Sequence, residues 1–208
     1  SKEKKLCYLI EKLESEIEQQ ILADGGHFSR SPSEQKVILQ ILIDIRRVLI
    51  DSQNPIPNSL QRAIDQMSPM LRFFRHQDGK LALFNGSRED DAKSIDSTLI
   101  QADTRGQPPR SAPDSGFERL LSGRLLVLAD TGAPARPFRG GGAHAGTLSI
   151  EVSVGQERMI VNCGTAIESE ATWKMVQRMT AAHSTLSVED RNSSEILNDG
   201  GIGRSARI

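Results

Sequence analysis

The first third of the chain places its apolar residues at helical intervals. Between residues 6 and 21 they recur every three or four positions with Lys and Glu between them, which predicts an amphipathic helix that ends at a Gly-Gly pair. A second helix is expected after Ser31. Proline is favoured at the first helical position, where Pro32 stands, and Glu34 lies where a capping-box partner belongs. The same spacing predicts a third helix over residues 59–75.

From residue 116 onward the pattern changes to short apolar runs separated by Gly, Pro and Asp, a rhythm typical of antiparallel sheets. Residues 87–98, between the two patterns, are polar and acidic, so a loop or a short helix is expected there. We expect strands over residues 117–121, 124–129, 147–154, 158–162 and 185–188.

Helices followed by strands predict an α+β fold, as one unit or as two consecutive domains. The change of pattern lies between Arg75 and Ala82, so we divide the chain into a helical part, residues 1–78, and a β part, residues 79–208. The chain starts without Met and inside a helical pattern, and its tail from Asn192 is rich in Ser, Asn and Gly. We therefore expect a piece of a longer polypeptide, with a frayed tail.

Composition excludes several classes of partner. The 208 residues carry a net charge of −1, and aromatic residues make up 4%, so nothing favours binding to nucleic acid or to an anionic membrane. The longest apolar runs are far shorter than the roughly 18 residues of a membrane span, and no signal peptide stands at the start. Cys7 and Cys163 are expected to be free thiols, with a disulfide between them as the alternative.

Polar side chains lie at the ends of three predicted strands. His144 precedes the strand of residues 147–154, His183 precedes that of residues 185–188, and Asn162 ends the strand between them. Strand ends of one sheet meet at a rim, so we expect the three side chains to converge on one side. Either the two histidines bind a metal or transfer protons, as imidazole does near neutral pH, or they make structural hydrogen bonds.

Basic residues stand near these motifs. His27 and Arg30 flank the Gly-Gly turn. Either they contact an anionic sugar, with Arg30 binding a carboxylate in a bidentate fork, or both lie in a solvent-exposed loop. Arg178 is expected to face the cleft of His183, five residues along the chain. Trp173, the only Trp, either stacks on a sugar ring or lies in the core or at its rim.

A basic cluster with two aromatic neighbours ends the third predicted helix. This cluster either contacts the substrate or packs between the helical and β parts. The cluster consists of Arg72, Phe73, Phe74, Arg75 and His76.

Several motifs resemble, in order and spacing, those of the heparinase II/III-like polysaccharide lyases, in particular an alphaproteobacterial branch. The likeness extends from about residue 16 to 190 and rests on residues 16–32 (EIEQQILADGGHFSRSP), 71–86 (LRFFRHQDGKLALFNG), 140–154 (GGGAHAGTLSIEVSV), 159–164 (MIVNCG) and 181–186 (AAHSTL). It implies that the helices belong to an incomplete α/α toroid and the strands to an antiparallel β-sandwich, truncated at both ends.

Lyases of this family cleave uronic-acid polysaccharides by β-elimination, which needs a neutralised carboxylate, a base for the α-proton and an acid for the leaving oxygen. The resemblance therefore implies an acidic polysaccharide as partner and a periplasmic location. It also implies a divalent metal, such as zinc or calcium, in the β part. The residues implied are His144 for catalysis, His27, Arg30 and Arg178 for substrate, and His144, Asn162 and His183 for the metal.

Four positions depart from the family's pattern. Glu34 stands where the lyases have Tyr, Gly142 where they have the first His of a strand motif, and Gly146 and Asn162 where they have Asp. The first hypothesis is a polysaccharide lyase that cleaves an acidic glycan by β-elimination. These departures favour the alternative, a non-catalytic glycan-binding or structural relative that has lost the catalytic residues. We expect weak binding of an acidic sugar without turnover.

Overall fold

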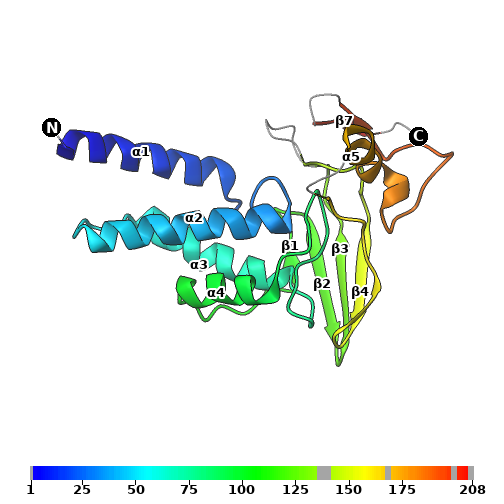
Figure 1. Cartoon of the computed structure of the whole chain (residues 1–208), viewed down its shortest axis with the longest axis horizontal. Coiled ribbons are helices and arrows are strands. Elements are labelled where there is room, and N and C mark those ends of the chain that lie inside the picture. Colours follow the sequence, from blue (N-terminus) through cyan, green and yellow to red (C-terminus); the bar gives the residue numbers. More distant parts are fainter. Residues whose placement is uncertain (1, 135–141, 167–169, 198–200, 206–208) are drawn as a thin grey trace.

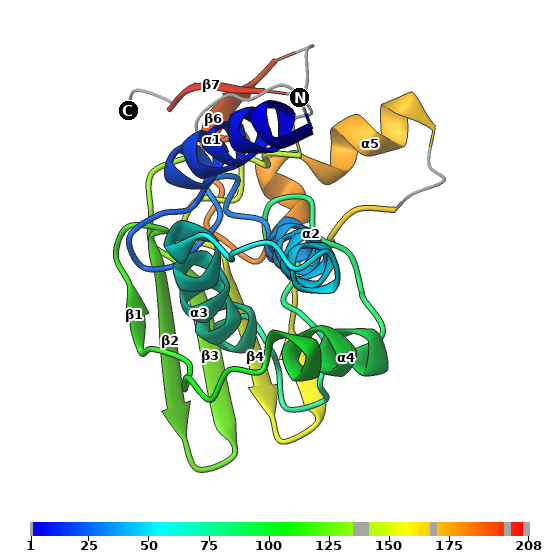
Figure 2. The same cartoon turned by 90° about the vertical axis from the view of Figure 1, so that its left-hand side faces the viewer.

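The computed structural model of the chain describes residues 2–134, 142–166, 170–197 and 201–205. Figure 1 shows a helical layer on one side and a sheet on the other, and Figure 2 shows the helices in front of the strands. The three predicted N-terminal helices form, and a short helix follows them in the polar stretch. The helices are α1 (Lys2–Gln20), α2 (Pro32–Asp51), α3 (Asn58–Phe73) and α4 (Ala92–Ala102).

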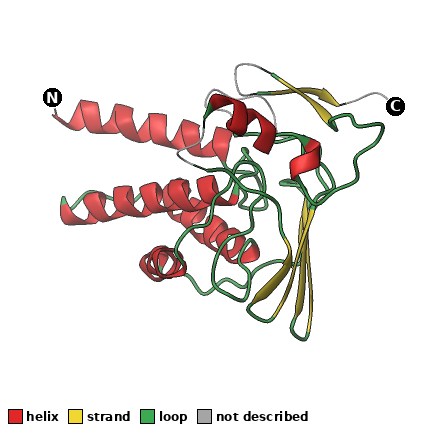
Figure 3. Ribbon diagram, turned by 45° about the vertical axis from the view of Figure 1, so that its right-hand side comes forward, coloured by secondary structure: helices red, strands yellow, loops and turns green. Residues whose placement is uncertain are grey.

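The strands form two separate antiparallel sheets (Figure 3). A five-stranded sheet has the order β1-β2-β3-β4-β5, and a two-stranded sheet pairs β6 with β7. This arrangement confirms the predicted α+β fold class. The strands are β1 (Ser111–Ala112), β2 (Phe117–Ser122), β3 (Leu125–Asp130), β4 (Ile150–Val154), β5 (Glu157–Ile160), β6 (Ser194–Ile196) and β7 (Ile202–Ser205), with the helix α5 (Ala171–Gln177) and the 3₁₀ turn η1 (Thr180–Ala182) between β5 and β6.

Helices and sheet share one continuous apolar core, in which three phenylalanines meet. The ring of Phe117, at the start of β2, lies 5.0 Å from that of Phe74 and 5.3 Å from that of Phe84, in edge-on and tilted geometries that aromatic pairs favour. α4 follows residue 79 in the chain, yet it packs on α2 and α3. Because the core extends through both parts, the division after residue 78 stays a prediction.

The basic cluster at the end of α3 holds the layers together. Arg72 donates to backbone carbonyls of the loop after α4. Arg75 forms an ion pair with Asp96 of α4, with 2.6 Å between nitrogen and oxygen, and His76 contacts Glu151 of β4 at 2.9 Å. Of the two alternatives for this cluster, the structure bears out packing within the fold.

β4 turns its polar side chains inward. Glu151 and Ser153, and Ser149 just before the strand, are at most 1% exposed, whereas the apolar residues that alternate with them are half-buried on the opposite face. The alternation predicted a strand correctly. Its buried face is polar because other segments supply hydrogen-bonding partners, without which burial of such groups is unfavourable.

Glu151 is the centre of this buried network. Its Oε2 atom accepts from His76 Nε2 at 2.9 Å, and its Oε1 atom accepts from the backbone N–H of Leu83 at 2.8 Å and from both the backbone and the side-chain nitrogen of Asn162. Ser153 contacts the other ring nitrogen of His76 at 2.9 Å. One carboxylate thus joins the exit of α3, the segment before α4 and the end of β5.

The strand predicted at residues 185–188 does not form, and this prediction is wrong. Side chains take the hydrogen bonds that a ladder would need. Ser184 N–H donates to Asn162 Oδ1 at 3.1 Å, and Thr185 Oγ1 donates to the carbonyl of Thr147 at 2.7 Å. The segment therefore crosses the end of the sheet as an irregular loop.

The strand predicted at residues 147–154 is shorter than expected and begins at Ile150. Leu148 has a φ of 61°, in the left-handed region, which is incompatible with a strand. The tail from Asn192, expected to fray, contains β6 and β7 instead.

The capping box predicted at the start of α2 is also wrong. Ser31 occupies the N-cap position, but its hydroxyl makes no cap hydrogen bond and contacts Ser87 Oγ at 3.0 Å instead. Glu34 is exposed. Among the helices of the described residues, none has the length and apolarity needed to cross a membrane.

We predict that Glu151→Ala strongly destabilises the fold. The substitution leaves buried donors from three segments without an acceptor. Each unsatisfied donor lowers the free energy of unfolding by about 1–3 kcal/mol. Urea unfolding at neutral pH measures the loss. Glu157→Ala, at an exposed position of β5, is the matched control and should change stability by less than about 0.5 kcal/mol. Equal unfolding midpoints for the two variants would contradict the central role of Glu151.

Candidate functional site

Two buried histidines contact each other at the end of the sheet. His144 Nδ1 lies 3.0 Å from His183 Nε2, with the rings nearly perpendicular. His183 Nδ1 lies 2.7 Å from the carbonyl of Met179, so this nitrogen carries the proton. His183 Nε2 is then an acceptor, His144 Nδ1 donates to it, and His144 Nε2 accepts from Thr165 Oγ1 at 3.3 Å. The hydrogen bonds run in one direction, from Thr165 to Met179.

Both imidazoles are held neutral. Burial, with smaller effects in the same direction from the neighbouring His183 and Arg178, lowers the pKa of His144 to about 3. Burial also lowers the pKa of His183, against a smaller opposite effect from the Met179 carbonyl. A neutral pair is what the one-directional chain of hydrogen bonds requires.

Asn162, the third residue predicted to converge here, is hydrogen-bonded to Glu151 and not to the two histidines. Asn162 is 1% exposed, and its amide nitrogen donates to Glu151 while its oxygen accepts from the backbone of Ser184. Sequence reasoning therefore brought His144 and His183 together correctly. The side chain of Asn162 fixes the loop that carries His183.

The donor set does not fit a divalent metal. A zinc site needs three or four ligands, and calcium needs six or more oxygens. His144 and His183 direct nitrogens at each other, and the oxygen of Asn162 is already bonded. Nowhere in the described residues do three or more His, Cys, Asp or Glu side chains gather as a metal site.

The helical part reaches the histidine pair through Ser87. Ser87 Oγ contacts Ser31 Oγ at 3.0 Å and accepts from the backbone N–H of Ser33, in the first turn of α2, at 3.1 Å. The carbonyl of Ser87 accepts from the backbone N–H of Thr165 at 2.9 Å, and the side chain of Thr165 contacts His144. Sequence analysis missed Ser87 and Thr165, because single hydroxyl residues in polar loops carry no recognisable signal.

Two exposed charges flank this junction. Glu34 lies in the first turn of α2, and Arg88 follows Ser87 directly. The hydroxyl of Ser33 holds the backbone of Arg88, accepting from its N–H at 3.1 Å. Within the described ranges of the chain, Arg88 forms no ion pair, whereas the nearby carboxylate of Asp90 pairs with a lysine at 3.1 Å.

His27 and Arg30 are buried, so the exposed-loop alternative is wrong. His27 is 4% exposed, its backbone N–H donates to Gln35 Oε1 at 2.7 Å, and burial lowers its pKa to about 4. Arg30 pairs with the buried Asp130 and lies over the ring of Phe117, 4.9 Å from its centroid. Their roles toward substrate stay predictions, and both side chains are engaged inside the fold.

The side chain of Arg178 is also hydrogen-bonded within the chain. It donates to the carbonyls of Ala143 at 3.0 Å and Gly201 at 2.6 Å, and so links the histidine loop to the two-stranded sheet. Trp173 is 56% exposed, which excludes the core alternative. Cys7 and Cys163 are exposed free thiols, as predicted.

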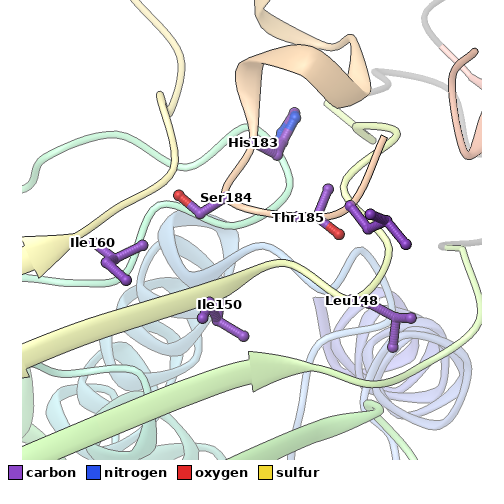
Figure 4. A pocket seen from close by; sticks show the side chains of 7 residues that line it. Leu148, Ile150, Ile160, His183, Ser184 and Thr185 are labelled. Carbon is purple, nitrogen blue, oxygen red and sulfur yellow. The ribbon is translucent and has the colours of Figure 1, made fainter. Parts of the chain in front are cut away.

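An apolar hollow of about 460 Å³ lies beside His183 (Figure 4). Leu148 and Ile150 are on one side and Ser184 and Thr185 on the other. None of its lining residues carries a permanent charge. The hollow therefore offers nothing to neutralise a carboxylate.

We predict that His27 makes the fold sensitive to acid. Its pKa is about 4 when folded and about 6.5 when unfolded, so the unfolded chain binds the proton first. The contribution to stability is complete above pH 6.5. It is lost toward pH 4 at about 1.4 kcal/mol per pH unit. Urea midpoints of His27→Gln should fall less on acidification than those of the unchanged protein.

The control for this prediction is Gln20→Ala, which removes a partner of the same ring, 3.3 Å from Nε2, but keeps the titrating group. It should preserve the pH slope of the unchanged protein. An unchanged slope in His27→Gln would show that this ring is not the source.

The sequence of the chain is similar to those of known proteins. The sequence model described as Heparinase II/III N-terminus matches residues 4–105, and that described as Heparinase II/III-like, C-terminal matches residues 104–208. FtsZ-localized protein C of Caulobacter vibrioides (strain NA1000 / CB15N) is 32% identical over 182 residues, which are 88% of this chain and 31% of that protein.

Solved structures share the fold. A crystal structure of heparinase III matches with a TM-score of 0.72 and 13% identity, over 86% of this chain and 34% of its own. The heparan sulfate lyase HepC from Pedobacter heparinus matches with a TM-score of 0.64 and 19% identity, over 86% and 32%. The chain spans about a third of these relatives. By its sequence and its fold, the chain belongs to the heparinase II/III-like family.

Proposed function

We propose that the chain is part of a non-catalytic heparinase II/III-like protein that binds an acidic polysaccharide at the junction of helices and sheet. The observation that carries this proposal is the histidine pair. His144 is 5% exposed, and both of its ring nitrogens are hydrogen-bonded inside the chain. A base must reach the proton that it removes, and His144 has no nitrogen left for a substrate.

Two further positions within the described residues differ from those of the lyases. Glu34 carries a carboxyl group where the resembled lyases carry the phenol of a tyrosine. Gly142 provides no side chain at the position where the lyases have the first His of their strand motif. This set of residues favours the non-catalytic hypothesis over the lyase hypothesis.

Binding of an acidic sugar is supported by Arg88. Its guanidinium is exposed beside Ser87, and a guanidinium binds a carboxylate or sulfate through two parallel hydrogen bonds. Trp173 offers an exposed aromatic surface on α5, suitable for packing against a sugar ring. The family, and the heparan sulfate lyase among the similar structures, support an acidic polysaccharide as the class of ligand.

We predict no turnover of heparan-type or alginate-type glycans. The measurement is the ultraviolet absorbance of the unsaturated uronate that β-elimination creates, followed during incubation with each glycan. The trace should stay flat. A steady rise that His144→Ala abolishes would restore the lyase hypothesis and overturn the proposal.

Binding is tested separately with the same glycans by titration calorimetry. Arg88→Ala should weaken binding about tenfold or more, because a charge-assisted hydrogen bond contributes about 1.5–3 kcal/mol. Arg47→Ala is the matched control: Arg47 is exposed on α2, thirteen residues from Glu34 and therefore about 20 Å along the helix. Equal affinities for the two variants would exclude Arg88 from the glycan site.

A second candidate function follows from FtsZ-localized protein C, which shares more sequence with this chain than the lyases do. On this candidate, the protein that contains the chain localises with FtsZ. A fluorescent fusion should then overlap with labelled FtsZ in the same cells. Fluorescence spread evenly through cells with assembled FtsZ would exclude this candidate.

A further inference from the structure

Two exposed side chains of opposite formal charge stand at the junction of helices and sheet. Glu34 follows Ser33 in the first turn of α2, and Arg88 follows Ser87 in the chain. Among the ion pairs formed within residues 2–134 and the other described ranges, none includes Glu34 or Arg88. The acid and the base therefore stay close to each other without neutralising each other.

The backbones that carry this acid and this base are tied together by two buried serines. The N–H of Arg88 donates to Ser33 Oγ at 3.1 Å, and the N–H of Ser33 donates to Ser87 Oγ at 3.1 Å. Ser33 is 6% exposed and Ser87 is fully buried. Groups that recognise a ligand work best when packed neighbours hold them in place. The buried serines provide that support on the protein side, while Glu34 and Arg88 face solvent.

The neighbouring charges are already compensated by partners within the chain. Asp90 pairs with Lys36, and Glu89 pairs with Lys80, each with 3.1 Å between nitrogen and oxygen. The junction therefore offers a ligand one basic group and one acidic group. A ligand that carries only negative charges satisfies the base but lies against the acid, and such a like-charge contact is a common source of specificity.

We propose that Glu34 determines which acidic glycan this site binds: a polysaccharide in which a uronate alternates with an amino sugar whose nitrogen is unsubstituted. Arg88 binds the carboxylate through two parallel hydrogen bonds, and Glu34 accepts hydrogen bonds from the ammonium group of the adjacent sugar. A glycan with a carboxylate on every sugar is disfavoured, because one carboxylate meets Glu34. This inference rests on the proposed glycan binding and adds the class of acidic glycan.

The first arm of the test uses the unchanged chain and three probes in titration calorimetry at neutral pH. They are an unsulfated heparan-type glycan with N-acetylated amino sugars, the same glycan after chemical N-deacetylation, and an alginate-type glycan. The N-deacetylated form should bind at least about tenfold more tightly than its N-acetylated parent, and the alginate-type glycan should bind most weakly. This arm does not require any variant to fold.

The second arm compares Glu34→Gln, which has nearly the same size but no charge, with Asp51→Asn. Asp51 is exposed, seventeen residues further along α2 and therefore about 25 Å away, so its variant removes the same formal charge outside the site. Glu34→Gln should lose the preference for the N-deacetylated glycan and bind the alginate-type glycan more tightly than the unchanged chain does. Asp51→Asn should keep the preference.

The outcomes separate this inference from the proposed function. Binding of both heparan-type probes with equal affinity would overturn the role of Glu34 and leave glycan binding intact. A preference that Glu34→Gln keeps, or that Asp51→Asn loses as well, would overturn it in the same way. No binding of any of the three probes would overturn the glycan site and this inference together.

Discussion

The buried carboxylate of Glu151 is the constraint on which the arrangement of this chain depends. It accepts hydrogen bonds from His76 after α3, from Leu83 and from Asn162, so it joins helices and sheet at one point. Asn162 connects Glu151 to the segment that carries His183. Its amide nitrogen donates to Glu151, and its oxygen accepts from the backbone N–H of Ser184, next to His183. A buried carboxylate is stable only with its full set of donors, so these segments must assemble together.

The buried polar groups around the histidine pair are bonded to partners inside the chain. Arg30 is bound to Asp130, Arg178 to backbone carbonyls, and the two histidines to each other. Each of these groups stabilises the native fold through partners within the chain. Chemistry on a substrate requires the opposite, namely polar groups that are held in place but left available. Arg88 is exposed beside Ser87, and the proposed binding of an acidic sugar rests on it.

Apolar surfaces remain on both layers. A hollow of about 510 Å³ between α1 and α2 is lined almost entirely by aliphatic side chains, and Figure 1 shows α1 standing apart from the other helices. On the outer face of the sheet, Leu120, Val127, Val152 and Ile160 lie opposite one another on neighbouring strands. Contiguous apolar surface of this kind is typical of contacts with other protein segments.

The sequence by itself determined the helices α1 to α3, the α+β order, the family and the proximity of His144 and His183. Helical periodicity and the order of motifs are short-range properties, which a single chain displays directly. Only the tertiary structure decided that β4 buries Glu151, that residues 185–188 form no strand and that Ser87 joins the two parts. It also decided that both ring nitrogens of His144 are hydrogen-bonded inside the chain. These outcomes depend on partners far away in the chain. The free energy of a buried polar group or a close contact depends on what the rest of the fold brings to it.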